Sequence, residues 1–495
     1  MMSAFFVFKS RKKDRFSGFL LYCPRKNQFP GVPTKEHVEI KGGLMEFKKL
    51  KEVGLFELLS KRGKEVFMPQ GVFHWVNRAK KEAHIDATIG IGRGLKSEIS
   101  DTASSDSTVL YLPSIEATFN DLEPEEVFPY ASPTGLPAFR QAWKEWQIWK
   151  MKQQHGDNAK LPSLMMPIVT SGLTGALYTL STLFIDPEET VVVPDKRWGV
   201  YDMTMSQLIG ARLESVPLFH QGRINVQGFA EALIKSAQKQ HKMLLILNFP
   251  HNPTGFMPDP QNVQELKDAL VTVVDKTGKD LVVFLDDAYE GLVYDQGIRQ
   301  WSLFSDLATL HPKILPIKID GISKEFFFWG GRIGCITFPL MNHWDKHGDI
   351  ECELENKVGA IIRGTVSNAC RLVQGLMARL LNENREQLLK ERDRLITVIS
   401  ERAHILREEL EALTGPVVQA DPFNAGLFAL LNIQGISAGK FADHLLRHYG
   451  IGTVAFENKE RGLNGIRITF GSVIKEDIPK VVDCIGKTIK DMSEK

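Results

Sequence analysis

One short stretch of this sequence sets a lysine and an arginine among aromatic residues and glycines. It runs from Asp320 to Gly334 and reads DGISKEFFFWGGRIG, with Lys324 and Arg332 eight positions apart. Apolar surroundings disfavour an ammonium group, so they lower the pKa of a lysine and favour the free amine that forms a Schiff base with an aldehyde. Arginine offers a fork of donors that suits a phosphate or a carboxylate, and glycines let the backbone approach a ligand closely. The stretch therefore predicts an amine nucleophile beside an anion site.

The elements that must position such a site precede this stretch. Between Leu161 and Ile319, short apolar runs alternate with helical stretches, which is typical of β/α units around a mainly parallel sheet. The candidate strands are Met166–Thr170, Thr190–Val193, Arg212–Val216, Met243–Asn248, Leu281–Leu285 and Ile314–Ile319. Ligands of open α/β sheets bind beyond the carboxyl ends of the strands, so we expect functional residues directly after these runs.

Two of these strands lead into residues that suit a flat, anionic ligand. Gly172, Leu173 and Thr174 open a helix after the first strand, and the free N–H groups and dipole at a helix start bind anions. Trp198 follows the second strand and offers a ring for stacking.

Two further turns follow the fourth and fifth candidate strands. The fourth leads into a double-proline turn, His251 to Gly255, which fixes Asn252 in place. The fifth is followed by Asp286 and Tyr289, a carboxylate and a phenol that suit a cationic ring nitrogen and a phenolate. Each turn alone has an ordinary structural explanation, because strand ends commonly carry Asp, Asn and Pro.

In combination these residues describe a site for pyridoxal 5'-phosphate. The motifs HNPTG at 251–255, D-x-A-Y at 286–289 and SK at 323–324, with an arginine eight residues after the lysine, resemble those of class I aminotransferases. These are fold type I pyridoxal-phosphate enzymes, and the resemblance is nearest to aspartate aminotransferase. It extends from about Gly90 to the C-terminus.

The resemblance implies an α/β fold in two parts. A large domain would hold a mainly parallel seven-stranded sheet sandwiched by helices, and a smaller α/β domain would be built from the N- and C-terminal parts. We expect a basic, poorly ordered extension over residues 1–44, the N-terminal part of the small domain over 45–114, the large cofactor-binding domain over 115–370, and a linking helix with the C-terminal small domain over 371–495. The linking helix is expected from about Arg371 to Leu413.

The resemblance also implies a role for each matched residue. Lys324, Asp286 and Tyr289 would be catalytic: Lys324 would hold the cofactor as a Schiff base, Asp286 would pair with its ring nitrogen, and Tyr289 would hydrogen-bond its ring oxygen together with Asn252. The other implied cofactor contacts are stacking by Trp198, phosphate binding by Gly172, Leu173, Thr174 and Arg332, and a contact of Tyr130 with the phosphate of a neighbouring subunit. This last contact implies a homodimer with shared active sites.

Two arginines bear on the substrate. Arg467 matches the residue that binds the α-carboxylate through a bidentate pair, and Arg363 matches the position that binds the distal carboxylate of a dicarboxylate across the dimer. Gly90, Trp198 and Asn252 are the other substrate-binding candidates. The implied reaction is a ping-pong transamination between an amino acid, aspartate or glutamate, and a 2-oxo acid.

Two positions depart from the family pattern. Gly321 stands where a serine usually contacts the phosphate, and Ser323 is a candidate replacement. Tyr201 stands where the closest relatives have a histidine that supports the ring-binding aspartate, and its phenol can also hydrogen-bond Asp286.

Other functions stay open on the same motifs. An aromatic or broad-specificity aminotransferase fits them, and so does another pyridoxal-phosphate reaction such as an α,β-lyase. A non-catalytic transcription regulator is disfavoured, because no convincing helix-turn-helix precedes the aminotransferase-like part.

Composition excludes several classes of partner. The chain has 495 residues, a formal net charge of +1, and no apolar run long enough to span a bilayer, so we expect neither a nucleic acid nor a membrane as partner. Its five scattered cysteines form no CxxC pair, which indicates neither a metal site nor a disulfide framework and favours the reducing cytoplasm. The basic start, residues 1–44, is either an organelle-targeting leader or sequence upstream of a second start at Met45.

Overall fold

The computed structural model describes residues 40–41, 44–45, 47–68, 71–101, 103–341, 343–344, 347–413 and 417–493. The chain divides into two compact units, Met1–Phe67 and Met68–Lys495. Most of residues 1–44, which we expect to be poorly ordered, lie outside the described residues. The described ones, 40–41 and 44, belong to two short strands that pair antiparallel. The first unit contains β1 (Ile40–Lys41), β2 (Leu44–Met45), α1 (Lys48–Glu52), the 3-10 helix η2 (Leu55–Leu58) and α2 (Lys61–Glu65).

A seven-stranded sheet forms the centre of the second unit, in the order β7-β15-β14-β13-β12-β8-β9. Of its seven strands, β15 alone runs antiparallel to its neighbours, so the predicted mainly parallel sheet is confirmed. The strands are β7 (Ile168–Thr170), β8 (Thr190–Pro194), β9 (Arg212–Val216), β12 (Met243–Asn248), β13 (Leu281–Asp286), β14 (Ile314–Gly321) and β15 (Gly334–Thr337). Six of them match the candidate strands. The seventh, β15, is short and begins with a glycine, so its own sequence gives little strand signal.

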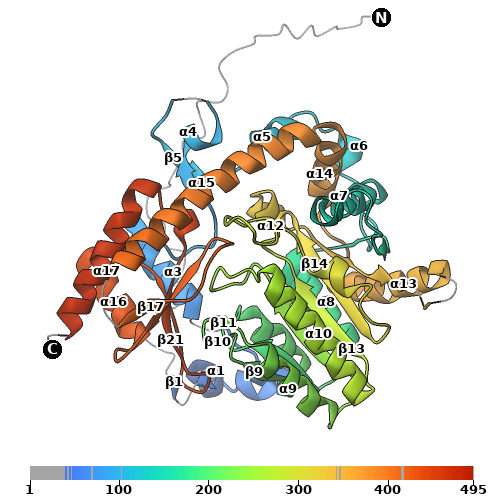
Figure 1. Cartoon of the computed structure of the whole chain (residues 1–495), viewed down its shortest axis with the longest axis horizontal. Helices are drawn as coiled ribbons and strands as arrows, with labels where there is room; N and C mark the ends of the chain where they lie inside the picture. The colour runs from blue at the N-terminus through green and yellow to red at the C-terminus, as the bar shows by residue number, and fades with distance from the viewer. Residues whose placement is uncertain are drawn as a thin grey trace, which may run out of the picture. The chain divides into compact units, whose positions relative to one another are not determined.

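Helices cover both faces of this sheet (Figure 1). Side chains alternate along each strand, so neighbours in sequence enter different apolar cores. Ile246 packs in the core that contains α8 (Gly172–Phe184), whereas Leu245 packs in the core that contains α9 (Val226–Ala237) and α10 (Pro260–Thr277). The central strands β12 and β13 are therefore apolar up to their last residues, Asn248 and Asp286, as buried parallel strands are.

The register brings the ends of three neighbouring strands together. Asn248 at the end of β12 lies opposite Asp286 at the end of β13, and Asp286 lies opposite Ile319 on β14. Residues that follow these strands thus meet at one edge of the sheet, where a ligand of this fold class binds.

A second, four-stranded antiparallel sheet lies in the C-terminal part, in the order β17-β18-β21-β20. Its strands are β17 (Val418–Ala420), β18 (Ala429–Ile433), β20 (Val454–Asn458) and β21 (Leu463–Ile468). Helix α16 (Ala438–Tyr449) packs on β20 and β21, and α17 (Ile478–Ser493) packs on α16. Close by, β3 (Ile85–Asp86) pairs with β19 (Ile451–Gly452), so an N-terminal and a C-terminal segment share this part of the fold. The expected smaller α/β part is therefore present, while the residue boundaries given above remain predictions.

The single helical stretch expected from Arg371 to Leu413 is in fact two helices. They are α14 (Arg371–Glu383) and α15 (Arg385–Ala412), separated at Asn384. Asn384 has φ −129° and ψ 26°, outside the helical region, and asparagine favours such breaks because its side chain competes for backbone hydrogen bonds. The long α15 runs from α14 to α17 and contacts both (Figure 1).

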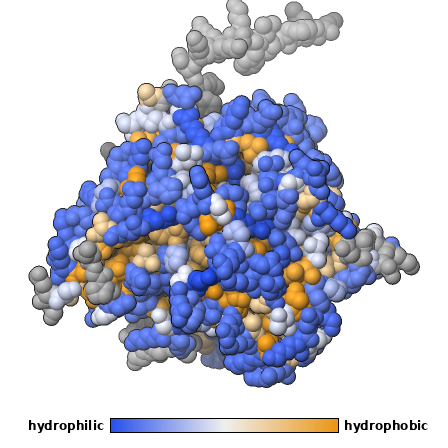
Figure 2. Space-filling model, viewed as in Figure 1, coloured by the Kyte–Doolittle hydropathy of each residue, from blue (hydrophilic) through white to orange (hydrophobic). Residues whose placement is uncertain are grey.

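The remaining described elements are shorter or lie at the surface. They are α3 (Gly71–Glu82), β4 (Arg93–Leu95), α4 (Lys96–Ile99), β5 (Ser107–Val109), α5 (Pro113–Phe119), α6 (Pro124–Val127), α7 (Pro137–His155), β6 (Ser163–Leu164), the π-helix η3 (Asp202–Ile209), β10 (Phe219–His220), β11 (Arg223–Ile224), α11 (Phe304–Leu307), α12 (Ile322–Glu325), η4 (Trp329–Gly331), β16 (Pro339–Leu340), α13 (His347–Thr365), η5 (Phe470–Ser472) and η6 (Lys475–Asp477). The face shown in Figure 2 is mostly hydrophilic, with apolar patches scattered over it. Among the described helices, none combines the length and the apolar character needed to cross a bilayer.

Candidate active site

A cavity of about 430 Å³ opens at the carboxyl edge of the seven-stranded sheet. Its wall brings together nine of the residues that the sequence singles out: Gly90, Leu173, Thr174, Trp198, Asn252, Asp286, Tyr289, Lys324 and Arg467. They come from loops, strands and the helices α8 and α12, between residues 90 and 467, so only the folded chain collects them. Four other predicted site residues lie outside this wall: Gly172, Arg332, Tyr130 and Arg363.

Lys324 lies on the short helix α12, directly after β14. Its side chain is half-buried, and its Nζ lies 5.3 Å from the centroid of the Tyr289 ring. Burial lowers the pKa of Lys324 to about 8; the nearby Asp286 carboxylate opposes this shift, and the Arg332 guanidinium adds to it. Far more of this lysine is a free amine near neutral pH than of an ordinary lysine.

Asp286, the last residue of β13, is only 1% exposed. Its Oδ2 accepts a hydrogen bond of 2.5 Å from the Tyr201 hydroxyl, and its Oδ1 accepts one of 3.2 Å from the Ala288 N–H. Burial raises the pKa of this carboxyl group, against the hydrogen bond from Tyr201 and the charge of Lys324. The phenol of Tyr201 thus supports the aspartate, as the sequence suggests for this departure from the family pattern.

Asn248 ties two of the strand ends together. Its Nδ2 donates to the main-chain oxygen of Asp286 at 2.7 Å, and its Oδ1 accepts from the N–H of Asn252 at 2.9 Å. The Oδ1 of Asn252 in turn accepts from Nη1 of Arg467 at 3.3 Å. Asn248 lines the cavity but is not among the residues predicted from the sequence. A polar residue at the end of an otherwise apolar strand is a signal that could have indicated it.

Arg467, on β21, is buried, and part of its guanidinium group has no partner among the described residues. Its Nη2 donates to the main-chain oxygen of Thr88 at 2.9 Å, and its guanidinium carbon lies 4.2 Å from the centroid of the Phe428 ring. No carboxylate of the described chain pairs with it, and its Nε has no hydrogen-bond partner there. Burial lowers the pKa of Arg467 to about 10. Because a buried unpaired charge is costly, this arrangement calls for an anion from outside the chain.

The start of α8 provides a second place for an anion. The cap residue Ser171 makes no side-chain hydrogen bond to the first N–H groups of this helix. A methyl group on Gly172 would lie 2.5 Å from Nη2 of Arg332, so the guanidinium lies directly against the helix start. Exposed Arg332 forms no ion pair with a described carboxylate, and the buried Ser323 hydroxyl has no partner among the described residues. Nη1 of Arg332 donates to the main-chain oxygen of Trp329 at 3.3 Å, which leaves its other donors, the helix start and the Ser323 hydroxyl for a phosphate group.

Gly321 is required where it stands. A methyl group on this residue would lie 2.5 Å from the main-chain oxygen of Ile333 and 2.9 Å from Cα of Gly334. The close approach of β14 and β15 therefore disfavours the serine that the family resemblance implies at this position.

Two predicted residues lie on the surface of the chain. The Tyr130 side chain is 88% exposed, ahead of α7. Arg363 is exposed in the last turn of α13, where its Nη1 donates to the Ser367 hydroxyl at 2.5 Å. Neither lines the cavity.

The rest of the wall is apolar and was largely missed from the sequence. It includes Val72 and Phe73 of α3, Met203, Trp329, Phe428 and Phe456. Such residues follow ordinary core patterns in the sequence, so only the fold reveals that they face a ligand cavity.

Known proteins resemble this chain along most of its length. Residues 101–485 match the family described as aminotransferase class I and II. An aspartate aminotransferase of Pyrococcus abyssi is 24% identical over 73% of this chain and 84% of its own length, and the aromatic-amino-acid aminotransferase 2 of Thermococcus litoralis is 23% identical over the same shares. The crystal structure of an aminotransferase from Anaerococcus prevotii superposes with a TM-score of 0.72 at 20% identity, over 87% of this chain and 98% of that one.

Proposed function

Because this chain belongs to the class I and II aminotransferase family, we propose that it transfers the amino group of aspartate or glutamate to a 2-oxo acid by a ping-pong mechanism. Aminotransferases of this family use pyridoxal phosphate, and the chain is a pyridoxal-phosphate-dependent transferase. When bound, the cofactor supplies an aldehyde that captures amino groups and a protonated ring that withdraws electrons.

The cavity residues fit this cofactor. Lys324 offers the amine, buried Asp286 offers a carboxylate for the ring nitrogen, and Trp198 offers a ring for stacking. Asn252 and Tyr289 are assigned to the ring oxygen. The start of α8 at Gly172, Leu173 and Thr174 is assigned to the phosphate together with Arg332. The cap residue makes no side-chain hydrogen bond there, and the Arg332 guanidinium lies against the helix start without an ion pair to a described carboxylate.

The chain's own groups supply the proton steps. Lys324 Nζ, as a free amine, would take the proton from the α-carbon of the substrate and return it at the cofactor, acting first as base and then as acid. Its low pKa supports this role. Asp286, held by Tyr201, would keep the ring nitrogen protonated.

The unpaired guanidinium of Arg467 is the single observation that carries the assignment of an amino acid as substrate. It is 5% exposed and lines the same cavity as Lys324, so an α-carboxylate bound there brings the amino group towards the lysine. Gly90, Trp198 and Asn252 are proposed to border the substrate, since all three line the wall.

The distal carboxylate is assigned to Arg363 of a second copy of the chain. We propose a homodimer in which Arg363 and Tyr130 enter the partner's active site. Their exposure in a single protomer and the absence of an ion pair on Arg363 among the described residues support this arrangement. The expected cytoplasmic location stays a prediction.

Aromatic amino acids are a second candidate class of substrate. The wall of Val72, Phe73, Met203, Phe428 and Phe456 is apolar, and its aromatic residues would pack well against an aromatic side chain. This alternative needs no contribution from Arg363.

The first test is the visible spectrum of the protein purified with pyridoxal phosphate. We expect an absorption band of lysine-bound cofactor that decays when aspartate or glutamate is added, much less with phenylalanine or alanine, and that returns with a 2-oxo acid. The Lys324→Ala variant should lack this band and all turnover while retaining some cofactor without a covalent bond.

Arg363→Ala separates the two substrate classes. Losing a charged partner costs about 2–5 kcal/mol, so the response to aspartate should fall on the order of a hundredfold while the response to phenylalanine is kept. A wild-type band that responds best to phenylalanine would leave the transaminase in place and remove the dicarboxylate assignment. A protein without any band would contradict the proposed cofactor site.

A further inference from the structure

A cluster of six buried charged side chains lies behind the proposed catalytic residues. We call it the charge cluster; each member is at most 4% exposed, and its members are the carboxylates of Asp287, Glu290, Asp320 and Glu325 and the ammonium groups of Lys150 and Lys318. None of the six has a role in the chemistry proposed above.

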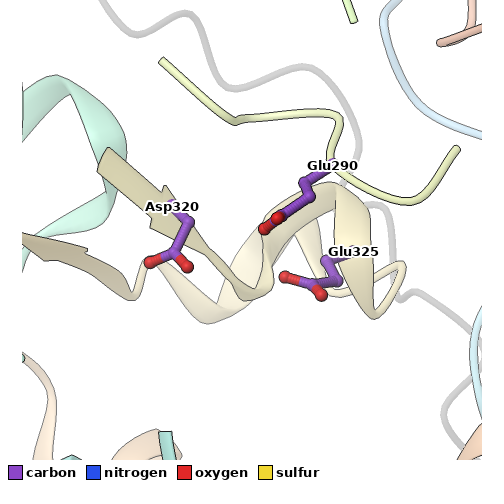
Figure 3. Close-up of side chains that lie close together, drawn as sticks. All are labelled: Glu290, Asp320 and Glu325. Carbon is purple, nitrogen blue, oxygen red and sulfur yellow. The ribbon is translucent and has the colours of Figure 1, made fainter. Parts of the chain in front are cut away.

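Lys150 lies at the centre of three of these carboxylates. One oxygen each from Glu290, Asp320 and Glu325 lies within 4.8 Å of the others, and Figure 3 shows the carboxylates of Glu290 and Glu325 close together with Asp320 beside them. Such a group resembles a metal site, but Lys150 Nζ lies 2.5 Å from Glu290, 3.0 Å from Glu325 and 3.7 Å from Asp320. The chain itself therefore supplies the cation.

Lys318 completes the charge cluster on the side of β13. Its Nζ lies 2.5 Å from Asp287 and 2.9 Å from Glu290. The Ser302 hydroxyl also donates to Asp287, at 2.6 Å. Each of the two ammonium groups thus bridges carboxylates, and Glu290 is shared between them.

Three of these carboxylates are immediate chain neighbours of proposed catalytic residues. Asp287 follows Asp286, Glu290 follows Tyr289, and Glu325 follows Lys324. Their side chains enter the charge cluster, while those of the residues before them line the cavity. Because Lys150 bonds both Glu290 and Glu325, it connects the turn after β13 with the turn after β14.

Helix α7 contributes one whole face to these contacts. Trp143, Trp146, Gln147 and Lys150 share a helix face by their spacing. The indole N–H of Trp143 and the Gln147 amide donate to Asp320, each at 2.9 Å, and the indole N–H of Trp146 donates to Glu325 at 2.9 Å. A third element therefore holds both turns.

Stability alone gives little reason for this arrangement. Charged groups are expensive to bury, and packed apolar residues of similar volume often stabilise a protein as well or better. What a buried, fully bonded network adds is a fixed geometry. The other charged group facing it is Arg392, whose Nε donates to the main-chain oxygen of Glu325 at 3.1 Å.

We infer that Lys150 is a positioning residue, whose ammonium fixes the distance and orientation between Lys324 and the Asp286–Tyr289 turn by bridging Glu325 and Glu290. This inference rests on the proposed roles of Lys324, Asp286 and Tyr289. Burial alone would lower the pKa of Lys150, but the three carboxylates outweigh this effect and raise it. Lys150 therefore stays charged across the pH range in which the enzyme is assayed.

The test compares Lys150→Met with Lys150→Arg as holoenzymes. We expect Lys150→Met to lower kcat by about tenfold or more with little change in KM, because a misplacement of about 1 Å can cost on the order of a hundredfold. It should also move the pH at which the visible band of the lysine-bound cofactor changes, since the charge of Asp286 favours the protonated form of the Lys324 nitrogen and this effect depends on the distance between the two groups. Lys150→Arg, which keeps the charge, should restore much of both.

A double variant covers the case in which Lys150→Met does not fold. Lys150→Met combined with Glu325→Gln removes an opposite pair of charges and keeps an acceptor for the indole of Trp146, so it should fold and still show both defects. The matched control is Lys242→Met, which removes a part-buried partner of Glu189 at the amino end of the sheet and should leave kcat and the band unchanged.

The outcomes separate this inference from the proposed function. An active wild type, with a Lys150→Met or double variant that keeps kcat and the band's pH response per folded molecule, would overturn the positioning role. A loss of thermal stability alone, equal to that of Lys242→Met, would do the same. A wild type without band or turnover would instead contradict the proposed function.

Discussion

Two lysines on or next to β14 show how local surroundings decide what the same residue type does. Lys318 and Lys324 are both buried or half-buried, six positions apart. Lys318 lies between Asp287 and Glu290, whose charges outweigh burial and raise its pKa. For Lys324, burial and the Arg332 guanidinium outweigh the single carboxylate of Asp286, and its pKa falls to about 8. The first is therefore fixed as a cation, and the second is available as an amine.

Opposite stability effects are expected for the two lysines in the cofactor-free protein. Lys324→Met should raise the free energy of unfolding at pH 7 by at most about 3 kcal/mol. The reason is that folding lowers the pKa of Lys324 from 10.5 to about 8, and each pKa unit corresponds to about 1.4 kcal/mol. The folded wild type binds this proton less tightly than the unfolded chain, so its stability rises between about pH 8 and 10.5 and the advantage of the variant shrinks.

Lys318→Met is the counterpart of this variant. It leaves the buried Asp287 carboxylate without a cation and takes one of two cations from Glu290, so it should cost about 3–5 kcal/mol at pH 7. Urea unfolding of both variants at pH 7 and pH 10 measures the two effects. A loss of stability at pH 7 in Lys324→Met as large as that in Lys318→Met would show that the pKa of Lys324 is not lowered in the folded protein.

The elements of the fold were predictable to different degrees. The strands β9 and β12 match their predicted ranges, and β12 has the stronger signal, an apolar run bounded by turn residues. The break at Asn384 was missed, since the sequence around it has the pattern of a continuous helix. The strand β15 was missed because four residues starting with glycine are too few to show the alternation that is typical of a strand. The contacts of α7 with the charge cluster were also beyond reach, because Lys150 is 140 residues away from Glu290 in sequence.

The approach of β14 to β15 gives a prediction at this scale. Gly321→Ser would place a side-chain carbon 2.5 Å from the Ile333 main-chain oxygen, so the strands must move apart, at a cost of about 1–3 kcal/mol. Gly348→Ala is the control: it lies exposed in α13 with no atom within 4 Å of the added methyl group, and it should stabilise the helix by about 0.5–1 kcal/mol. Urea unfolding compares the two variants. Wild-type stability in Gly321→Ser would mean that the two strands are not held this closely.

At the scale of the whole molecule, one surface exposes large apolar side chains that a partner chain would cover. Phe128, Tyr130 and Val366 expose large apolar side chains, by 83%, 88% and 49%. Arg371 donates to the main-chain oxygen of Tyr130 at 3.2 Å, which brings this loop next to the junction of α13 and α14. Arg363 lies in the last turn of α13, so the two residues assigned to a partner's active site share one side of the chain.

Hybrid dimers test whether active sites are shared between two copies. In a dimer of one Lys324→Ala chain and one Arg363→Ala chain, sharing places both defects in one site and leaves the other site intact, so activity towards aspartate should be about half that of wild type. Without sharing, one site lacks its lysine and the other its arginine, and the hybrid should be no better than the Arg363→Ala homodimer. Two affinity tags isolate the hybrid, and a wild-type/Lys324→Ala hybrid gives the half-active reference. If Arg363→Ala alone keeps full activity, the hybrid is made with Tyr130→Ala in place of Arg363→Ala and assayed at limiting cofactor. The expected contact of Tyr130 is with the cofactor phosphate and does not depend on the substrate.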